Sequence, residues 1–216
     1  MAIFIPPYVG EEVKSKAEKT MFRRLEELNL KNAYVLHSLG LPKHKDKLYG
    51  EVDFVVICEL GVVCLEIKGG RIACRDGMWY FTDRYGKEHK KNEGPFAQCT
   101  GNMFNLRMAL SKNVFRGAYR KHVPMAAGVV FPDIRFESRG QEIIPEIIYD
   151  KPSPDINEYI EGIFAYWDSR EHRQTEKLTL MDIKNIVQYL RGNFAFIPLL
   201  DDRLGEIDSK ICRLTE

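Results

Sequence analysis

Two charged residues close one of the most apolar passages of the sequence. The segment from Cys64 to Gly70 reads CLEIKGG, so Glu66 and Lys68 stand two residues apart after a run of Val, Cys and Leu. The two-residue period of a strand places both side chains on the same face. Burial of either charge alone is costly, so each needs a compensating partner. Two explanations are open: the residues pair with each other at a sheet edge, or together they hold a ligand.

A third charged residue joins them when the preceding segment is folded as a hairpin. Residues 50–70 (GEVDFVVICELGVVCLEIKGG) are rich in Val and Ile and contain a turn signal at 59–61, which predicts a β-hairpin. If Ile57 pairs with Val62 across the turn, Asp53 stands opposite Glu66. Asp53, Glu66 and Lys68 then meet at one end of a hairpin that is otherwise apolar on both faces.

This meeting of charges suggests a particular chemistry. Two facing carboxylates repel unless one takes up a proton or a cation lies between them. Hard oxygen ligands favour Mg²⁺ or Mn²⁺, which bind one or two carboxylates together with water and substrate phosphate. A lysine beside such a metal can orient the attacking water and neutralise charge on a phosphate oxygen. These are the parts of a metal-dependent phosphodiesterase, although an Asp followed by Glu-x-Lys also occurs in unrelated proteins.

The rest of the chain alternates between helical and extended patterns. Helices are expected at 11–29, 95–111, 155–167 and 179–190, and strands at 33–37, within 71–89, at 125–131 and at 143–149. Basic loops are expected at 43–47, 87–94 and 115–122; such clusters can contact phosphates or can be ordinary solvated surface. A mixed β-sheet flanked by helices, an α/β architecture with C-terminal helices, follows from this order.

Composition narrows the protein class. The 216 residues are 44% hydrophobic and 29% charged, with a formal net charge of +1, as in a globular protein without a global basic field. The five cysteines show no CxxC pair, and neither they nor the five histidines show the spacing of a zinc site, which argues against a zinc-dependent hydrolase. No signal peptide and no apolar run of about 18 residues is found, so we expect a cytoplasmic protein without a membrane span.

The hairpin resembles the nuclease-related domain (NERD) family of the PD-(D/E)XK, or restriction-endonuclease-like, superfamily. The family's core signature is matched by Gly50, Glu51, Asp53, Gly61, Glu66, Lys68 and Gly69. A downstream Pro-x-x-Gln at the head of a helix is matched by Pro95 and Gln98. The family's helical glutamate is matched best by Glu18, with Glu11, Glu12 and Glu26 as rivals.

The resemblance implies a restriction-endonuclease-like core and a site within it. Asp53 and Glu66 would bind Mg²⁺ or Mn²⁺, with the backbone carbonyl of Ile67 as a candidate third ligand. Lys68 would assist the nucleophilic water, Glu18 would reach the metal through water, and Gln98 would lie at the rim. The implied substrate is DNA, with RNA as a second candidate. For Glu18 and Gln98, a solvated position on a helix surface is the competing explanation.

The resemblance also bears on organisation. Residues 1–150 would form the nuclease core and residues 151–216 a helical extension. Nuclease-related domains often precede a helicase, and Cys212–Glu216 (CRLTE) resembles the segment leading into a superfamily-one helicase. A helicase domain in cis or in trans is therefore an expected partner, although the sequence has no Walker A motif. The alternative to a nuclease is a non-catalytic DNA-binding or assembly module of a helicase-containing protein.

Overall fold

The computed structural model describes residues 1–10, 13, 15–41, 50–83, 85–153, 155–172 and 175–195. A central sheet of six strands has the order β1-β2-β3-β4-β8-β9. Its strands are β1 (Ile3–Ile5), β2 (Tyr34–Leu41), β3 (Gly50–Cys58), β4 (Gly61–Ile67), β8 (Met125–Phe131) and β9 (Ile148–Asp150). The β2–β3 and β3–β4 pairs are antiparallel, and the other three pairs are parallel. The expected mixed sheet is thereby confirmed.

The two middle strands form the centre of the core. Every residue of β4 and β8 is buried, because both strands have a neighbour on each side and helices cover both faces. This arrangement explains why their sequences are almost continuously apolar rather than alternating. Glu66 is the charged exception within these two strands.

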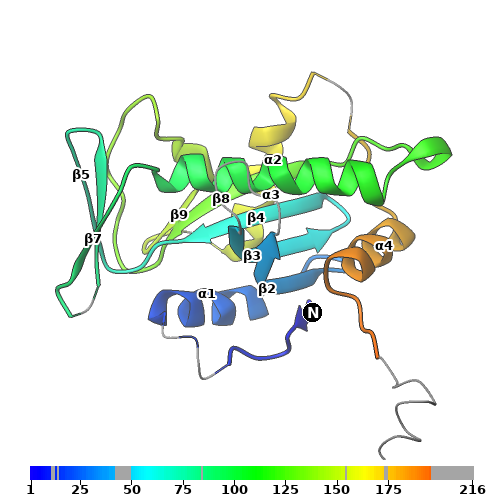
Figure 1. The fold of residues 1–216 in the computed structure, drawn as a ribbon, viewed down its shortest axis with the longest axis horizontal. Coiled ribbons are helices and arrows are strands. Elements are labelled where there is room, and N and C mark those ends of the chain that lie inside the picture. The colour runs from blue at the N-terminus through cyan, green and yellow to red at the C-terminus, as the bar shows by residue number, and fades with distance from the viewer. Residues whose placement is uncertain are drawn as a thin grey trace, which may run out of the picture.

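Four helices among the described residues pack on this sheet (Figure 1). They are α1 (Lys16–Glu26), α2 (Pro95–Asn113), α3 (Ile156–Asp168) and α4 (Leu180–Arg191). On one face, α1 places Phe22 against Phe54 of β3, and α3 places Tyr159 over Gly128 of β8. On the other face, Cys99 of α2 donates to the carbonyl of Cys64. Helix α4 packs against β2 and β3 beside the C-terminal end of α2, where the Asn113 amide lies 2.8 Å from the Tyr189 hydroxyl.

Local sequence signals fix the ends of these helices. The hydroxyl of Ser15 accepts a hydrogen bond from the backbone of Glu18 and caps α1, so this helix begins at Lys16 rather than at residue 11. Pro95 occupies the first turn of α2, as expected. Asp155 caps α3, and Thr179 forms a capping box with Asp182 at the start of α4.

A second, antiparallel sheet of three strands extends from one end of the molecule, at the left of Figure 1. It consists of β5 (Arg71–Arg75), β6 (Met78–Thr82) and β7 (Glu88–Lys91). The turn at Asp76–Gly77 has positive φ at both residues, the conformation that Asp-Gly pairs favour. Because β5 follows β4 after only a few residues, this small sheet lies beside the carboxyl end of β4.

Some predicted elements differ from the structure. Strand β1 was not predicted, and the strand expected at 143–149 is a 3₁₀ turn at Pro145–Ile147 followed by the short β9, because proline cannot donate to a strand ladder. A second 3₁₀ turn covers Gly117–Tyr119. Cys74 is exposed, whereas Cys58, Cys64 and Cys99 are buried.

Three predictions from the sequence are not tested by the structure. The basic loop at 43–47 and the segment Cys212–Glu216 lie outside the described residues. The division into a core over 1–150 and an extension over 151–216 stays a prediction. Among the described residues, no helix combines the length and the apolar character needed to cross a membrane.

Candidate active site

The antiparallel pairing of β3 with β4 brings the predicted site residues of the two strands together. Paired residues run from Cys58 and Gly61 at the turn to Phe54 and Leu65, and Ile57 pairs with Val62 as predicted. At the next position a side chain replaces the backbone: Oδ2 of Asp53 accepts the backbone N–H of Ile67 at 2.6 Å. This bond holds the Asp53 carboxyl at the carboxyl end of β4, beside Glu66.

Glu66 and Lys68 form an ion pair on a central strand. The ammonium of Lys68 bonds to Oε1 of Glu66, and the two side chains are 13% and 1% exposed. Of the two open explanations, a pair at a sheet edge is excluded, because β4 lies between β3 and β8. A backbone bond from the Lys68 N–H to the Val130 carbonyl, 2.9 Å, ties this residue to β8. The pair is therefore largely desolvated, and each charge depends on its neighbours.

The electrostatics of the two carboxyl groups are coupled. Burial, followed by the nearby charge of Glu66, raises the pKa of Asp53 well above its usual value. The Lys68 ammonium and the Ile67 N–H lower it, but they offset only part of that rise. Burial would lower the pKa of Lys68, but Glu66 and Asp53 outweigh it and the pKa is raised. Lys68 is accordingly a fixed positive charge at neutral pH, and ionised Asp53 is in an unfavourable environment.

Glu18 approaches the same end of the sheet from α1. It contributes to the raised pKa of Asp53, and its Oε2 lies 3.1 Å from Nε2 of His37 on β2. His37 is 2% exposed, and sequence reasoning treated it as an ordinary histidine. A buried histidine on an apolar face needs a polar partner. The position of His37 opposite Phe54 on β3 could therefore have indicated a buried pair. Of the rival acids, Glu26 is exposed in the last turn of α1, and residues 11 and 12 lie outside the described residues.

Two glycines after Lys68 permit the close approach of α1. A Cβ on Gly69 would lie 2.6 Å from the Ala17 Cβ and 3.1 Å from Oδ2 of Asp133. Gly70 has φ +78°, and its N–H donates to the same Asp133 oxygen at 2.8 Å. The chain therefore turns tightly under the N-terminal end of α1, which brings Glu18 near the site. Asp133, the acceptor in this turn, was not among the predicted site residues.

Helix α2 covers the site from the opposite face. The side-chain amide of Asn102 donates to the Glu51 carbonyl at 3.1 Å, and Asn102 is buried. Gln98 precedes it by one helical turn and is half-buried, so both residues project from the same side of α2. Gln98 thus lies on the side of α2 that covers β3, and its role at the rim stays a prediction.

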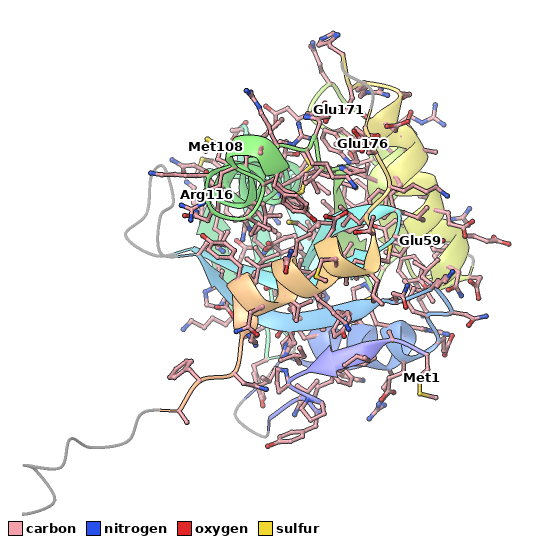
Figure 2. All side chains as sticks on the ribbon, turned by 90° about the vertical axis from the view of Figure 1, so that its right-hand side faces the viewer. Met1, Glu59, Met108, Arg116, Glu171 and Glu176 are labelled. Atoms are coloured by element: carbon pink, nitrogen blue, oxygen red, sulfur yellow. The ribbon has the colours of Figure 1, made fainter. Side chains whose placement is uncertain are left out.

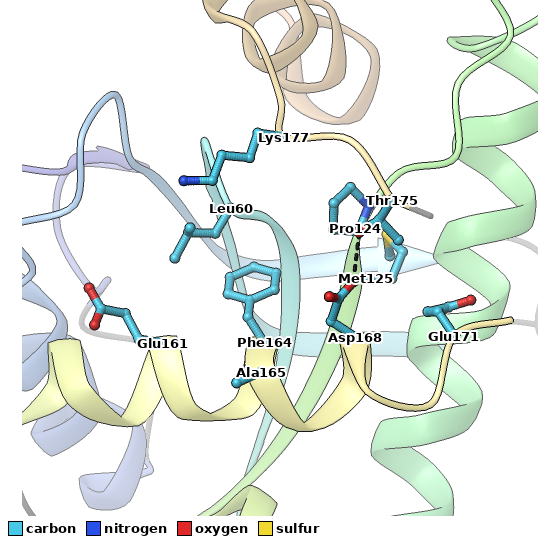
Figure 3. A pocket seen from close by; sticks show the side chains of 10 residues that line it. All are labelled: Leu60, Pro124, Met125, Glu161, Phe164, Ala165, Asp168, Glu171, Thr175 and Lys177. Carbon is cyan, nitrogen blue, oxygen red and sulfur yellow. Dashed lines mark hydrogen bonds between the residues drawn. The ribbon is translucent and has the colours of Figure 1, made fainter. Parts of the chain in front are cut away.

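Two hollows lie at opposite ends of the sheet. A groove of about 900 Å³ follows directly after Lys68; it is lined by Ser15 to Ala17, Gly69 to Arg71, Thr82, Asp83, Tyr85, Gly86 and Asp133. A pocket of about 470 Å³ lies at the other end, beside the starts of β4 and β8, between Leu60, Met125 and Phe164 (Figure 3). Figure 2 faces that second end, where Glu59 and Glu171 are labelled. The second pocket is remote from Asp53 and Glu66, so it does not belong to the candidate active site.

The candidate metal ligands at this site are few. Within the described part of the chain, no three or more His, Cys, Asp or Glu side chains group in a way that could hold a metal ion. Asp53 and Glu66 would have to suffice, together with backbone oxygen and water, which is a usual set for Mg²⁺. The raised pKa of Asp53 agrees with this assignment, because a cation beside both carboxylates would offset the burial and the Glu66 charge that raise it.

Comparison with known proteins agrees with the geometry. A family model described as the nuclease-related domain matches residues 14–132. This span is more than half of the chain and contains α1, the β3–β4 hairpin, the small sheet, α2 and β8. Searches of curated proteins and of solved structures found no match. The chain belongs to the nuclease-related domain family.

Proposed function

We propose that this protein is a metal-dependent nuclease that hydrolyses phosphodiester bonds in DNA. The observation that carries the proposal is the meeting of Asp53, Glu66 and Lys68 at the carboxyl end of β4. Membership of a nuclease-related family supports the same reaction class. Two oxygen ligands and a lysine that keeps its proton supply the charges needed to act on a phosphate group.

The metal, Mg²⁺ or Mn²⁺, would be held by Asp53 and Glu66, with the Ile67 carbonyl as the proposed third ligand. When bound, such an ion supplies a water of lowered pKa and neutralises charge on the phosphate. Asp53 is positioned for this task by the Ile67 N–H. Binding would convert Asp53 fully to its ionised form and release protons, so affinity would rise with pH.

The protein's own residues provide the remaining functions. Lys68 retains its proton, since Glu66 and Asp53 raise its pKa, and it offers a positive charge to the substrate phosphate or to the attacking water. Glu66 holds the Lys68 ammonium in place. Glu18, held by His37, would orient water from the α1 side, and Gln98 would line the rim.

The competing proposal is a DNA-binding or assembly module that lacks catalysis and serves a helicase in cis or in trans. Both proposals share the fold, so the discriminating test is cleavage of labelled single-stranded DNA, double-stranded DNA and RNA. Each is incubated with Mg²⁺, Mn²⁺ or EDTA. The wild type is compared with Asp53→Asn, with Lys68→Met, and with Glu161→Gln, a control at an exposed position on α3.

A nuclease predicts cleavage of DNA that EDTA abolishes and that Glu161→Gln retains. Asp53→Asn and Lys68→Met should each lose about 100-fold or more of the rate, the usual cost of removing a group that stabilises transition-state charge. Equal rates in these variants and the wild type would place the activity elsewhere. DNA binding without cleavage by any of the four proteins would favour the module that lacks catalysis.

A further inference from the structure

The small sheet packs one of its faces against α2 through Trp79. Trp79 is buried, and its ring lies 6.4 Å from that of Phe96 on α2. Phe81 is on the same face, and the Lys68 ammonium lies 5.6 Å from its ring centroid. Because side chains alternate along a strand, Tyr80 projects from the opposite side. The register places Ala73 and Lys90 beside it on that side.

This opposite side, here called the outer face, carries three exposed cations. The outer face comprises Arg71, Ala73, Arg75, Met78, Tyr80, Thr82, Glu88 and Lys90. Two of its cations flank the tyrosine: the Arg75 guanidinium carbon is 5.0 Å and the Lys90 ammonium 5.8 Å from the Tyr80 ring centroid. These distances allow cation–π attraction, which limits where the two charges can move. Glu88, 3.7 Å from Arg75, is the acid on this face.

The outer face adjoins a groove at the end of β4 that carries the candidate active site. Arg71 and Thr82 belong to the outer face and also line the groove of about 900 Å³ that begins at Gly69, directly after Lys68. Figure 1 shows the small sheet beyond the end of β4 that carries the site. A long polyanion bound on the outer face would therefore reach this groove beside the carboxyl end of β4.

We propose that the outer face binds the sugar-phosphate backbone of the nucleic acid that is cut at Asp53, Glu66 and Lys68. This inference rests on the proposed function and adds to it the surface that positions the substrate. The net charge of the whole chain is only +1, so attraction of a polyanion has to come from a local cluster such as this one. Contacts to phosphate carry no sequence information, so binding by the outer face is independent of sequence.

Binding of a fluorescein-labelled single-stranded oligonucleotide, followed by anisotropy in EDTA, tests this surface without any cleavage. The test variant combines Arg71→Gln, Arg75→Gln and Lys90→Gln. The control variant combines Lys112→Gln, Arg116→Gln and Lys184→Gln, all exposed and located near the C-terminal end of α2 and on α4 (Figure 2 labels Arg116). Thermal unfolding of each variant confirms that the fold is retained.

The expected result follows from counterion release. Loss of three phosphate contacts lowers the slope of log affinity against log salt by about 2 on a single strand, about 0.7 per contact. Between about 50 and 200 mM salt, the wild type and the control variant should lose roughly 20-fold more affinity than the test variant does. Cleavage by the test variant should show a raised KM and a kcat close to that of the wild type.

The outcomes separate this proposal from the proposed function. A wild-type salt slope in the test variant, or no binding by the wild type, would overturn the outer face as the substrate surface even if metal-dependent cleavage is observed. Binding that depends on the three cations, in a wild type that cuts nothing, would instead overturn the nuclease and leave the outer face as a nucleic-acid surface.

Discussion

Removing the Lys68 ammonium tests whether the Glu66–Lys68 pair stabilises the folded protein as well as the site. In Lys68→Met, the Glu66 side chain, 1% exposed, must stay charged without its ammonium or take up a proton. Breaking a buried pair by removing one partner costs about 3–5 kcal/mol. Because the Lys68 side chain is itself 13% exposed, we expect a loss near the lower end of that range. At about 2–4 °C per kcal/mol for a chain of this size, Tm should fall by roughly 6–12 °C.

The double variant Glu66→Gln with Lys68→Met separates the stability effect from catalysis. Neutral residues in place of both charges remove the desolvation cost as well as the attraction, so Tm should return most of the way to the wild-type value while cleavage stays absent. The assay is thermal unfolding in EDTA, followed by circular dichroism, of the wild type, both single variants and the double variant. The four Tm values together give the coupling energy between Glu66 and Lys68. If Lys68→Met had the Tm of the wild type, or if the stability losses of the two single variants simply added up in the double variant, the stabilising role of the buried pair would be refuted.

Three further predictions use the same unfolding assay. Gly69→Ala should cost about 1–3 kcal/mol and slow cleavage, because the new Cβ would lie 2.6 Å from α1. Its control is Gly162→Ala on α3, where nothing lies within 4 Å and stability should hold or rise by up to about 1 kcal/mol; equal effects would refute the contact. Asp182 is buried, but hydrogen bonds from Tyr119 and Lys121 outweigh the effect of burial and lower its pKa to about 2. Ionised Asp182 should therefore stabilise the folded protein above pH ~4, and this stabilisation should be lost as the pH falls toward ~2. Asp182→Asn should lower the free energy of unfolding by about 1–2 kcal/mol at neutral pH, after solvent screening, and should have almost no effect near pH ~2. Asp53→Asn should raise the Tm of the metal-free protein, increasingly so as pH rises above the usual aspartate pKa, since burial and Glu66 raise the pKa of Asp53; a lower Tm would contradict the coupling of the two carboxyl groups.

The hairpin and its register were predictable because they depend on local information. A turn signal at Gly61, together with apolar residues on both strands, fixes the pairing of Ile57 with Val62, and that pairing in turn places Asp53 near Glu66. Helices α2, α3 and α4 were also predicted, since each begins with its own proline or capping residue. The burial of the Glu66–Lys68 pair was not predicted, because it requires β8, which joins β4 from about 60 residues away along the chain.

The contacts around the site that were missed are likewise between distant elements. The Glu18–His37 pair depends on how α1 is rotated over the sheet, and helical periodicity alone does not define that rotation. The hydrogen bond from the Gly70 N–H to the Asp133 carboxylate joins residues 63 positions apart. The reason for the two consecutive glycines, the close approach of Ala17, becomes visible only in three dimensions.

The central claim is that Asp53 and Glu66 together hold a divalent cation, and titration with Mn²⁺ tests it most directly. Electron paramagnetic resonance reports the free ion as it is added to the wild type, to Asp53→Asn and to Glu66→Gln, with Glu161→Gln as the control. We predict one ion bound per chain in the wild type and in the control, and binding lost in both site variants. Equal Mn²⁺ binding by the wild type and the two site variants would contradict the metal site and, with it, the proposed mechanism.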